Sequence, residues 1–393
     1  LEQEEAKEFN DQTQGSFGGL GIQIQMVNGW LTVVEPLPDT PASKAGLMSG
    51  DKIVEIEGKS TRGVSIENVI KQLKGEPGTD VNITIARKGE KELLKKTLTR
   101  AVIHVSAVPD SEQYMLDSTI GYVRLRDFTR DAAEELESAI RNLQGEGMRG
   151  LILDLRDNVG GLLDVAVSIS DLFIEKDKII VTQKDRDKYE TVYKAEKKPL
   201  ADFLLAVLVN EFSASASEIV AGCIQDHKRG IIVGPAGHRT FGKGSVQTLY
   251  ELPSLPGASL KMTTAKYYTP LGRSIEQEKG LLPDIFAPIT DEQRRAIIIA
   301  GKIGKLLPEQ VGKETNEKSG LEELNAFYDG RAIDEESDSN SKKSAEPDQP
   351  ITVDEVFQEP EKTEDDNLYD IELFTAYQCL KSAQVLTADG AGQ

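Results

Sequence analysis

The sequence contains few of the residue types that disulfide frameworks, metal sites and histidine-dependent hydrolases require. Its 393 residues include two cysteines, Cys223 and Cys379, and three histidines, His104, His227 and His238. The cysteines lie far apart in the sequence, and the histidines lack the spacing of metal ligands. We therefore expect no disulfide framework, no metal and no cofactor, and a Ser/His/Asp hydrolase is poorly supported.

Long apolar runs and a balance of charge are also missing. No stretch is long and apolar enough to span a bilayer, and residues 1–10 lack the apolar core of a signal peptide. The net charge of −20 argues against nucleic acid as a partner. Half of this charge falls in residues 331–370, with 14 acidic and 4 basic side chains. That composition indicates a solvated, mostly disordered linker, with an acidic binding site as the alternative.

Residues 18–104 have the alternation and turn signals of a small β-rich domain. Apolar residues alternate with glutamines in Ile22–Met26, which indicates a half-buried strand. The following Asn28-Gly29 pair predicts a tight hairpin turn. The other expected elements are strands at 53–56 and 81–86 and helices at 41–45 and 65–74.

Residues 119–290 alternate apolar strands with amphipathic helices, which is the pattern of an α/β domain. The apolar run Gly150–Leu155 predicts a central strand buried on both faces. The other expected elements are strands at 122–125, 205–209 and 231–233 and helices at 131–143 and 215–228.

The pattern after residue 289 is helical. Thr290 and Gln293 have the spacing of a capping box, which predicts a helix as far as about Leu306. An amphipathic helix is expected at 368–386, where Ile371, Phe374, Tyr377 and Leu380 share one face. An isolated helix of this kind docks on its parent domain or on a second subunit, and both remain open.

The serine-rich run Ser213–Glu218 lies between an expected strand and an expected helix. A helix N-terminus favours negative charge, which an oxyanion needs. A serine at this place requires a neighbouring base to act as a nucleophile, because its hydroxyl alone is too weak. In isolation the run is more often an ordinary helix N-cap.

Two glycine-containing segments supply the partners that such a serine needs. Lys243 lies between two glycines, and a desolvated lysine can accept a proton, with Gln247 available to hold the amine. In isolation, a lysine is more often a solvated surface residue. Gly160 and Gly161 directly follow the buried strand, where backbone N–H groups can point at an oxyanion. In isolation, such a glycine pair is more often an ordinary turn.

Together and in this order, these segments resemble the carboxy-terminal processing (tail-specific) proteases over residues 15–290. The resemblance implies that Ser215 is the nucleophile, Lys243 its base and Gln247 the residue that holds the lysine. It also implies an oxyanion hole formed by the N–H groups of Ala216 and of a glycine, Gly161 rather than Gly160. The sequence departs from the family at Val159, where proline is usual, and in a longer turn at 235–239.

The β-rich domain resembles a PDZ domain. Its Gly19, Leu20, Gly21 and Ile22 match the loop that binds a peptide's terminal carboxylate through backbone N–H groups, and the turns at 39–46 and 50–51 follow the same pattern. The bound peptide is expected to add as a strand beside residues 22–26 and to face the helix at 65–74.

The resemblance implies an α/β protease core of the crotonase/ClpP-like ββα type with a β-rich PDZ domain and a helical, partly disordered C-terminal tail. The expected division is an N-terminal remnant at 1–16, the PDZ domain at 17–105, the protease core at 106–290, and C-terminal helices with the acidic linker at 291–393.

The expected function is that of a serine endopeptidase that cuts proteins near their C-termini. Its partners are expected to be proteins or peptides with apolar C-termini, an adaptor protein, and further copies of the chain bound through the terminal helices. The resemblance implies the periplasm or another envelope compartment, with the targeting segment removed.

Two alternatives remain. Residues 237–244 come close to a P-loop, but Gly244 stands where a hydroxyl should hold Mg²⁺. A PDZ scaffold with an inactive core is the other alternative. Intact Ser215, Lys243 and Gln247 argue against the scaffold, whereas Val159 and the longer turn argue for it.

Overall fold

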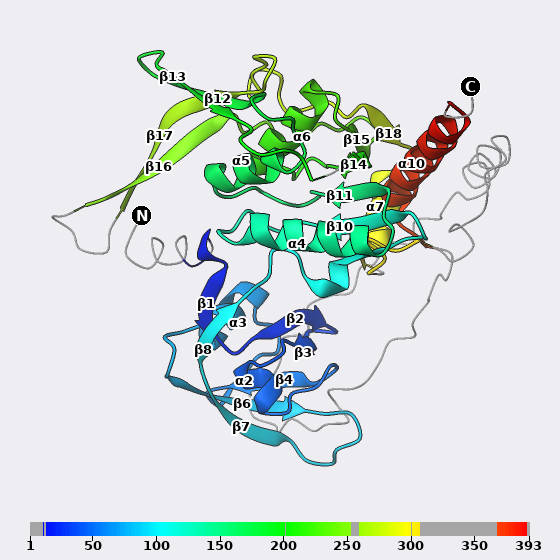
Figure 1. Cartoon of the computed structure of the whole chain (residues 1–393). Helices are drawn as coiled ribbons and strands as arrows, with labels where there is room; N and C mark the ends of the chain where they lie inside the picture. The colour runs from blue at the N-terminus through cyan, green and yellow to red at the C-terminus, as the bar shows by residue number, and fades with distance from the viewer. Residues whose placement is uncertain are drawn as a thin grey trace. The chain divides into compact units, whose positions relative to one another are not determined.

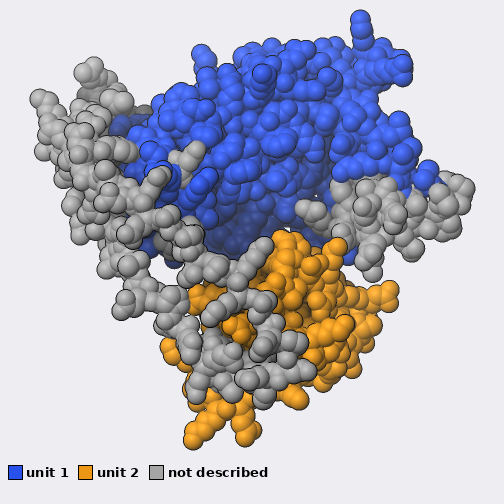
Figure 2. Space-filling model, turned by 180° about the vertical axis from the view of Figure 1, so that it is seen from behind, with its two compact units in different colours: residues 1–17, 104–311, 364–393 blue, residues 18–103, 312–363 orange. Residues whose placement is uncertain are grey.

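The computed structural model describes residues 11, 13–200, 202–252, 259–299, 301–306 and 368–390. The chain divides into two compact units, coloured separately in Figure 2. Unit 1 comprises residues 1–17, 104–311 and 364–393, and unit 2 comprises residues 18–103 and 312–363. Among the described residues, no helix has the length and apolar character needed to cross a membrane.

Unit 2 is built on an antiparallel sheet with the strand order β2-β3-β4-β6-β7, and β5 pairs with β4. Asn28 and Gly29 both have positive φ, 53° and 75°, which confirms the tight hairpin turn between β2 and β3. Its strands and helices are β2 (Ile22–Val27), β3 (Trp30–Pro36), α2 (Pro41–Lys44), β4 (Lys52–Ile56), β5 (Lys59–Ser60), α3 (Ile66–Leu73), β6 (Asp80–Ala86) and β7 (Leu94–Thr99).

Unit 1 contains a six-stranded sheet with the order β18-β15-β14-β11-β10-β9, parallel except for β9 (Figure 1). Every residue of the central strand β11 is buried, as predicted. The strands are β9 (Gln113–Met115), β10 (Ile120–Arg124), β11 (Gly150–Asp154), β14 (Leu204–Leu208), β15 (Ile231–Pro235) and β18 (Ile285–Ala287). A short 3₁₀ helix, η1 (Asp110–Glu112), precedes β9, and β1 (Ser16–Gly19) pairs with β8 (Ala101–His104) in a separate two-stranded sheet.

Helices cover both faces of the six-stranded sheet because side chains alternate along each strand. Leu151 and Leu153 of β11 pack with the helices α4 (Ala132–Gly145), α5 (Leu163–Asp171) and α6 (Ala216–Asp226). Ile152 points to the other face and packs with α10 (Ile371–Gly390). The C-terminal helix therefore docks on its own domain and supplies one of the two layers that bury this sheet.

A second, antiparallel sheet of unit 1 has the order β13-β12-β17-β16. Its strands are β12 (Ile179–Asp185), β13 (Glu190–Lys194), β16 (Ser245–Glu251) and β17 (Ser259–Tyr268). β16 is an edge strand, and it begins two residues after Lys243. None of these four strands was predicted from the sequence.

The predicted elements are confirmed, with ends that differ by one or two residues, except in the C-terminal region. The capping box is present, because the N–H of Thr290 donates to Gln293 and the N–H of Gln293 donates to Thr290, at 3.0 and 3.3 Å. The helix α7 (Asp291–Ile299), however, ends well before Leu306. Gly301 and Gly304 follow with φ of 64° and 74°, which is incompatible with a continuing α-helix.

Candidate active site

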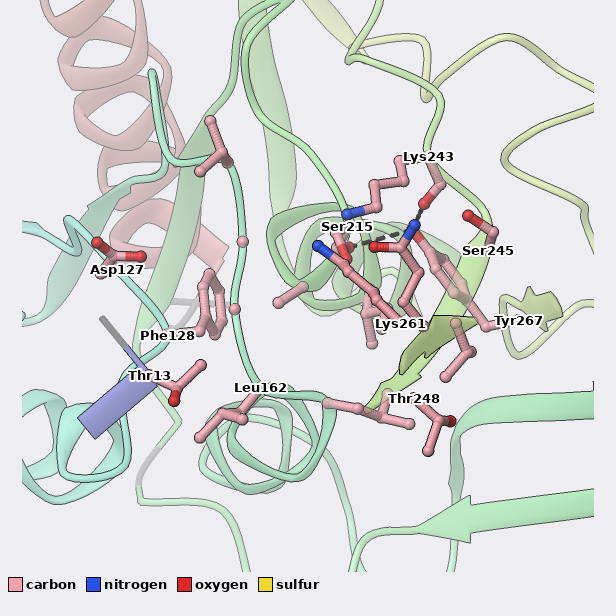
Figure 3. A pocket seen from close by; sticks show the side chains of 18 residues that line it. Thr13, Asp127, Phe128, Leu162, Ser215, Lys243, Ser245, Thr248, Lys261 and Tyr267 are labelled. Carbon is pink, nitrogen blue, oxygen red and sulfur yellow. Dashed lines mark hydrogen bonds between the residues drawn. The ribbon is translucent and has the colours of Figure 1, made fainter. Parts of the chain in front are cut away.

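Six of the predicted site residues line one cavity of about 450 Å³ in unit 1 (Figure 3). They are Gly160, Gly161, Ser215, Ala216, Lys243 and Gln247. They come from three loops that are far apart in the sequence, after β11, before α6 and before β16, with Gln247 on β16 itself. Gly19, Leu20, Gly21 and Ile22 belong to unit 2 and are described separately below.

The three serines of the Ser213–Glu218 run have different environments. Ser213 and Ser217 are fully buried, and each donates its hydroxyl to a backbone carbonyl, of Leu155 and of Asn158, at 2.8 Å. These two hydroxyls fasten the loop before α6 to the loop after β11. Ser215 lines the cavity instead. Of the three serines, the predicted nucleophile is therefore the one that lines the cavity.

The backbone of Ser215 is strained, with φ of 55° and ψ of −111° directly before α6. A non-glycine residue held in such a conformation costs about 1–3 kcal/mol, and residues of this kind cluster at functional sites. The surrounding contacts must therefore hold Ser215 in place.

Glu218 provides part of that support, a role that the sequence analysis missed. Its buried carboxylate accepts hydrogen bonds from the N–H groups of Ser215, Gly242 and Lys243 at 2.9, 2.7 and 2.9 Å, and from the Thr240 hydroxyl at 2.6 Å. Burial raises the pKa of Glu218, although these four hydrogen bonds act in the opposite direction. One side chain thus holds the backbones of Ser215 and Lys243 together.

Tyr267 on β17 holds the same two residues through their carbonyls. Its buried hydroxyl donates to the carbonyl of Lys243 and contacts the carbonyl of Ser215 at 3.2 Å. Glu218 binds the two N–H groups and Tyr267 the two carbonyls, so the relative position of Ser215 and Lys243 is fixed on both sides. The serine-to-glutamate spacing of a capping box was a signal for Glu218, whereas no sequence signal pointed to Tyr267.

Lys243 is half-buried in a loop whose glycines allow close packing. A side chain at Gly244 would meet Glu276 at 3.0 Å, and one at Gly242, which has φ of 91°, would meet the backbone of Gly280 at 3.0 Å. Burial lowers the pKa of Lys243, and the charge of Lys261 lowers it further, while Glu218 acts in the opposite direction. The neutral amine, which is the form that accepts a proton, is therefore favoured relative to a solvated lysine.

Gln247 lies on β16 immediately after a β-bulge, and its side chain is exposed at the cavity. Within the described part of the chain, no hydrogen bond joins the Lys243 amine to Gln247 or to the Ser215 hydroxyl. Hydrogen bonds of this kind often form only when substrate is bound.

The loop after β11 presents its glycines to the N-terminus of α6. The Asn158 side chain donates to the carbonyl of Leu125 at 2.8 Å and accepts from the N–H of Gly160 at 2.9 Å. The N–H of Gly161 makes no hydrogen bond to any described residue. Any side chain at Gly160 would lie 2.8 Å from the N of Ala216.

The structure describes both positions at which the sequence was expected to depart from the family pattern. Val159 is exposed and lines the cavity. The longer turn at 235–239 is anchored at its end, because Arg239 donates to the carbonyl of Gly280 at 3.0 Å. The P-loop alternative is wrong, because the strand β16 rather than a helix follows Lys243 and because Glu218 already occupies the N–H groups of the loop.

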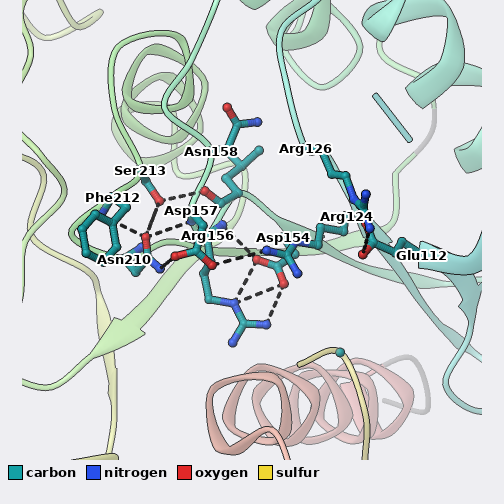
Figure 4. A network of polar contacts seen from close by, with 12 residues as sticks. Glu112, Arg124, Arg126, Asp154, Arg156, Asp157, Asn158, Asn210, Phe212 and Ser213 are labelled. Carbon is teal, nitrogen blue, oxygen red and sulfur yellow. Dashed lines mark hydrogen bonds and ion pairs between the residues drawn. The ribbon is translucent and has the colours of Figure 1, made fainter. Parts of the chain in front are cut away.

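Arg156 joins the loop after β11 to the start of the C-terminal helix α10. Its buried guanidinium contacts the carboxylates of Asp154, Asp370 and Glu372 at 2.6, 2.7 and 2.7 Å. Figure 4 shows Arg156 beside Asp154, together with the contacts that Asn210 makes to Asp157 and Ser213. Asp370 closes the segment predicted to be a solvated linker, and this prediction is wrong for that residue, because Asp370 is 1% exposed.

In unit 2, the loop Gly19–Ile22 turns two of its carbonyls inward. The carbonyl of Leu20 accepts from the N–H of Ala42 at 3.0 Å, and that of Gly21 accepts from the N–H of Leu37 at 2.9 Å. In a trans peptide the next N–H points the opposite way, so the N–H groups of Gly21 and Ile22 point away from these partners. They lead into β2, which is an edge strand among the described strands of this sheet.

The chain is similar to known proteins over most of its length. Residues 119–287 match the peptidase family S41, and residues 18–98 match the PDZ domain. A carboxy-terminal-processing protease of Bartonella bacilliformis is 39% identical over 325 residues, which are 81% of this chain and 72% of that protein. The carboxy-terminal processing protease CtpA of Bacillus subtilis is 34% identical over 78% of this chain and 63% of that protein. A solved photosystem II D1 C-terminal processing protease is 31% identical, covers 73% of this chain and 77% of its own, and has a TM-score of 0.45.

The α/β fold, the PDZ domain and the sequence matches define a serine-type peptidase. The chain belongs to peptidase family S41, in the group of the carboxy-terminal processing proteases.

Proposed function

We propose that the protein is an endopeptidase that uses a Ser215–Lys243 dyad to cut protein substrates near their C-termini. The observation that carries this proposal is the double attachment of the two residues, through Glu218 at their N–H groups and Tyr267 at their carbonyls. The attachment fixes a serine and a lysine with a lowered pKa at the wall of one cavity.

The reaction is acyl transfer. Neutral Lys243 accepts the proton of Ser215, whose Oγ attacks the carbonyl carbon of the scissile bond. The N–H groups of Ala216 and Gly161 stabilise the oxyanion. Lys243 returns the proton to the leaving nitrogen, the C–N bond breaks, and an acyl ester remains on Ser215. Lys243 then takes a proton from water, the hydroxide attacks the ester, and Ser215 leaves with that proton.

Unit 2 binds the C-terminus of the substrate. The N–H groups of Gly19, Leu20, Gly21 and Ile22 receive the terminal carboxylate, and the last residues pair with β2 as an added strand. This proposal is supported by the inward carbonyls of the loop and by the edge position of β2. Gating of the catalytic site by this domain is part of the proposal.

Further expectations from the resemblance accompany this function. They are the crotonase/ClpP-like type of the core, the domain limits given above, the disordered part of the tail, an adaptor protein, a homo-oligomer and an envelope compartment. Gln247 is proposed to orient the Lys243 amine once substrate is bound.

The test is cleavage of an unfolded protein with an apolar C-terminus by the parent chain, Ser215→Ala and Lys243→Ala. Each variant should lose at least about 10³-fold in kcat/KM, because removing the nucleophile or the base of such a unit removes most of the acceleration. Ser168→Ala, on the exposed side of α5, and Lys266→Ala, on β17, are the matched controls and should retain full activity. Full activity of Lys243→Ala would contradict the dyad. Binding of the tail without cleavage by the parent would favour the inactive scaffold.

A further inference from the structure

A second lysine, Lys261, lies at the catalytic cavity and has no task in the reaction proposed above. It is on β17, opposite Leu249 of β16, and it lines the same cavity as Ser215 and Lys243. In Figure 3 the side chains of Lys243 and Lys261 both extend toward Ser215. Two cationic groups thus share the wall on which the nucleophile lies.

The strand fixes Lys261 relative to the dyad. β17 lies between β12 and β16 and pairs with both. The same strand carries Tyr267, whose hydroxyl contacts the carbonyls of Ser215 and Lys243. The strand that holds the dyad therefore also determines where Lys261 stands.

Four titratable groups lie at the cavity or beside the backbone of Lys243. Glu218 on α6 is a buried carboxylate, and its negative charge favours the protonated amine. Asp127 lies on the opposite wall of the cavity, and Tyr267 is neutral because burial raises the pKa of its hydroxyl. Lys261 is the cation of this set. Without it, the other charge that acts on Lys243, that of Glu218, would favour the protonated form, which cannot accept a proton.

We propose that Lys261 is a further functional residue of this site, whose positive charge opposes protonation of Lys243 and so keeps the amine available as a base. The inference rests on the proposed role of Lys243 in the dyad. It has a general chemical basis, since a lysine beside another cationic group is a recognised way to obtain a neutral, reactive amine. Lys261 acts through Lys243, and the reacting atoms remain those of Ser215, Lys243 and the substrate.

The test is the pH dependence of kcat/KM for the parent chain, Lys261→Met and Lys261→Arg. Because kcat/KM follows the free enzyme, its acid limb reports protonation of the base. In Lys261→Met the limb should move to higher pH, with activity on that limb lower by about three- to ten-fold, the effect of one unit charge a few ångströms away in water. Lys261→Arg keeps the charge and should keep the parent profile.

Lys266→Met is the matched control on the same strand. Lys266 forms an ion pair with Glu276 at 2.8 Å and does not line the cavity, so its removal should leave the profile unchanged. Since Lys261 is exposed, the gap between the parent and Lys261→Met should also shrink as salt is raised. A merely structural role for Lys261 would produce neither the shift of the limb nor its dependence on salt.

The failures of the two proposals are distinguishable. If Lys243→Ala is inactive while Lys261→Met keeps the parent acid limb, the inference on Lys261 is wrong and the dyad stands. Equal damage by Lys261→Arg and Lys261→Met would also overturn the inference, because charge would not be the property that matters. If Lys243→Ala is active, the proposed dyad is wrong.

Discussion

Buried carboxylates form two clusters of polar contacts in unit 1, and they are stabilised in different ways. Among the described residues, Glu218 accepts four hydrogen bonds from neutral donors of the cavity loops and none from a cation. Asp154, Asp370 and Glu372 instead surround the guanidinium of Arg156. The first cluster arranges the proposed catalytic residues, whereas the second joins the C-terminal helix α10 to the sheet.

From this difference we expect the contacts of Glu218 to affect activity and those of Arg156 to affect stability. Hydrogen bonds from neutral donors are directional, so Glu218 fixes the geometry of two loops. Its burial is unfavourable to the charged form and raises its pKa. A buried arginine with three carboxylates is held by charge, and removing it leaves those charges uncompensated. We therefore expect the two clusters to fail in different assays.

The largest effect on stability is expected for Arg156→Met. Loss of the guanidinium leaves three buried carboxylates without their cation, and breaking a buried pair costs about 3–5 kcal/mol. Urea unfolding of the purified chain measures this loss. The control is Arg141→Met, which removes an exposed arginine paired with Glu137 one helical turn away and should change the free energy of unfolding by about 0.5 kcal/mol or less. Comparable losses in the two variants would contradict the stabilising role assigned to the Arg156 cluster.

A large effect on activity is expected for Gly160→Ala. The new methyl group would lie 2.8 Å from the N of Ala216, where the oxyanion is proposed to bind. Losing one such donor costs about 10²–10³-fold in kcat. The matched control is Gly237→Ala, where φ is also positive, at 80°, but open space surrounds the site. Both variants share the backbone strain, so a loss of activity in Gly160→Ala alone would come from the close contacts of the new methyl group with Ala214, Ser215 and Ala216.

Glu218→Gln tests whether the Glu218 contacts affect activity more than stability. The glutamine keeps the shape but replaces one acceptor oxygen by an amide donor, which opposes the N–H donors of the loops. Leaving buried donors unsatisfied costs about 1–3 kcal/mol, which we expect to appear as a ten- to hundred-fold loss of kcat/KM. The free energy of unfolding should fall much less than in Arg156→Met. A variant that loses stability and keeps activity would contradict the role assigned to Glu218.

The smallest effect is expected for Asp117→Asn, whose carboxylate contacts Tyr377 and Lys381 in the middle part of α10. Burial acts to raise the pKa of Asp117, but hydrogen bonds from Thr119, Ile120, Lys381 and Tyr377 outweigh it and lower the pKa to about 2. A carboxyl with a lowered folded-state pKa stabilises the fold above its unfolded pKa, and this contribution disappears as the pH falls toward 2.

The Asp117→Asn variant should therefore be less stable than the parent at pH 7, by about 1 kcal/mol. The difference should close in acid as the carboxyl of the parent takes up its proton. Urea unfolding at several pH values measures it. A difference that persists undiminished at pH 2 would contradict the assignment.

The parts of this site that follow local patterns could be predicted from the sequence. The buried strand before Gly160, the small residues around Ser215 and the glycines beside Lys243 each carry their signal within a few residues. The strand β17 could not be predicted, because Ser259–Tyr268 shows no clean alternation of apolar and polar residues. Tyr267 and Lys261, which both lie on β17, were missed for this reason.

The Arg156 cluster could not be predicted for a different reason. Its partners Asp370 and Glu372 lie more than 200 positions away in the sequence, and in the sequence Asp370 is the last residue of an acidic run. A carboxylate in such a run has the same local pattern whether it is solvated or buried beside an arginine. Only the docking of α10 on the sheet separates the two cases.

The most direct test of the account is to trap the acyl-enzyme. Acid quenching of the reaction with an unfolded substrate, followed by mass spectrometry of the digested chain, should find the N-terminal fragment of the substrate bound as an ester to Ser215. The adduct should be absent from Ser215→Ala. A covalent adduct on another residue, or product formation by Ser215→Ala at the parent rate, would contradict the proposed Ser215–Lys243 peptidase.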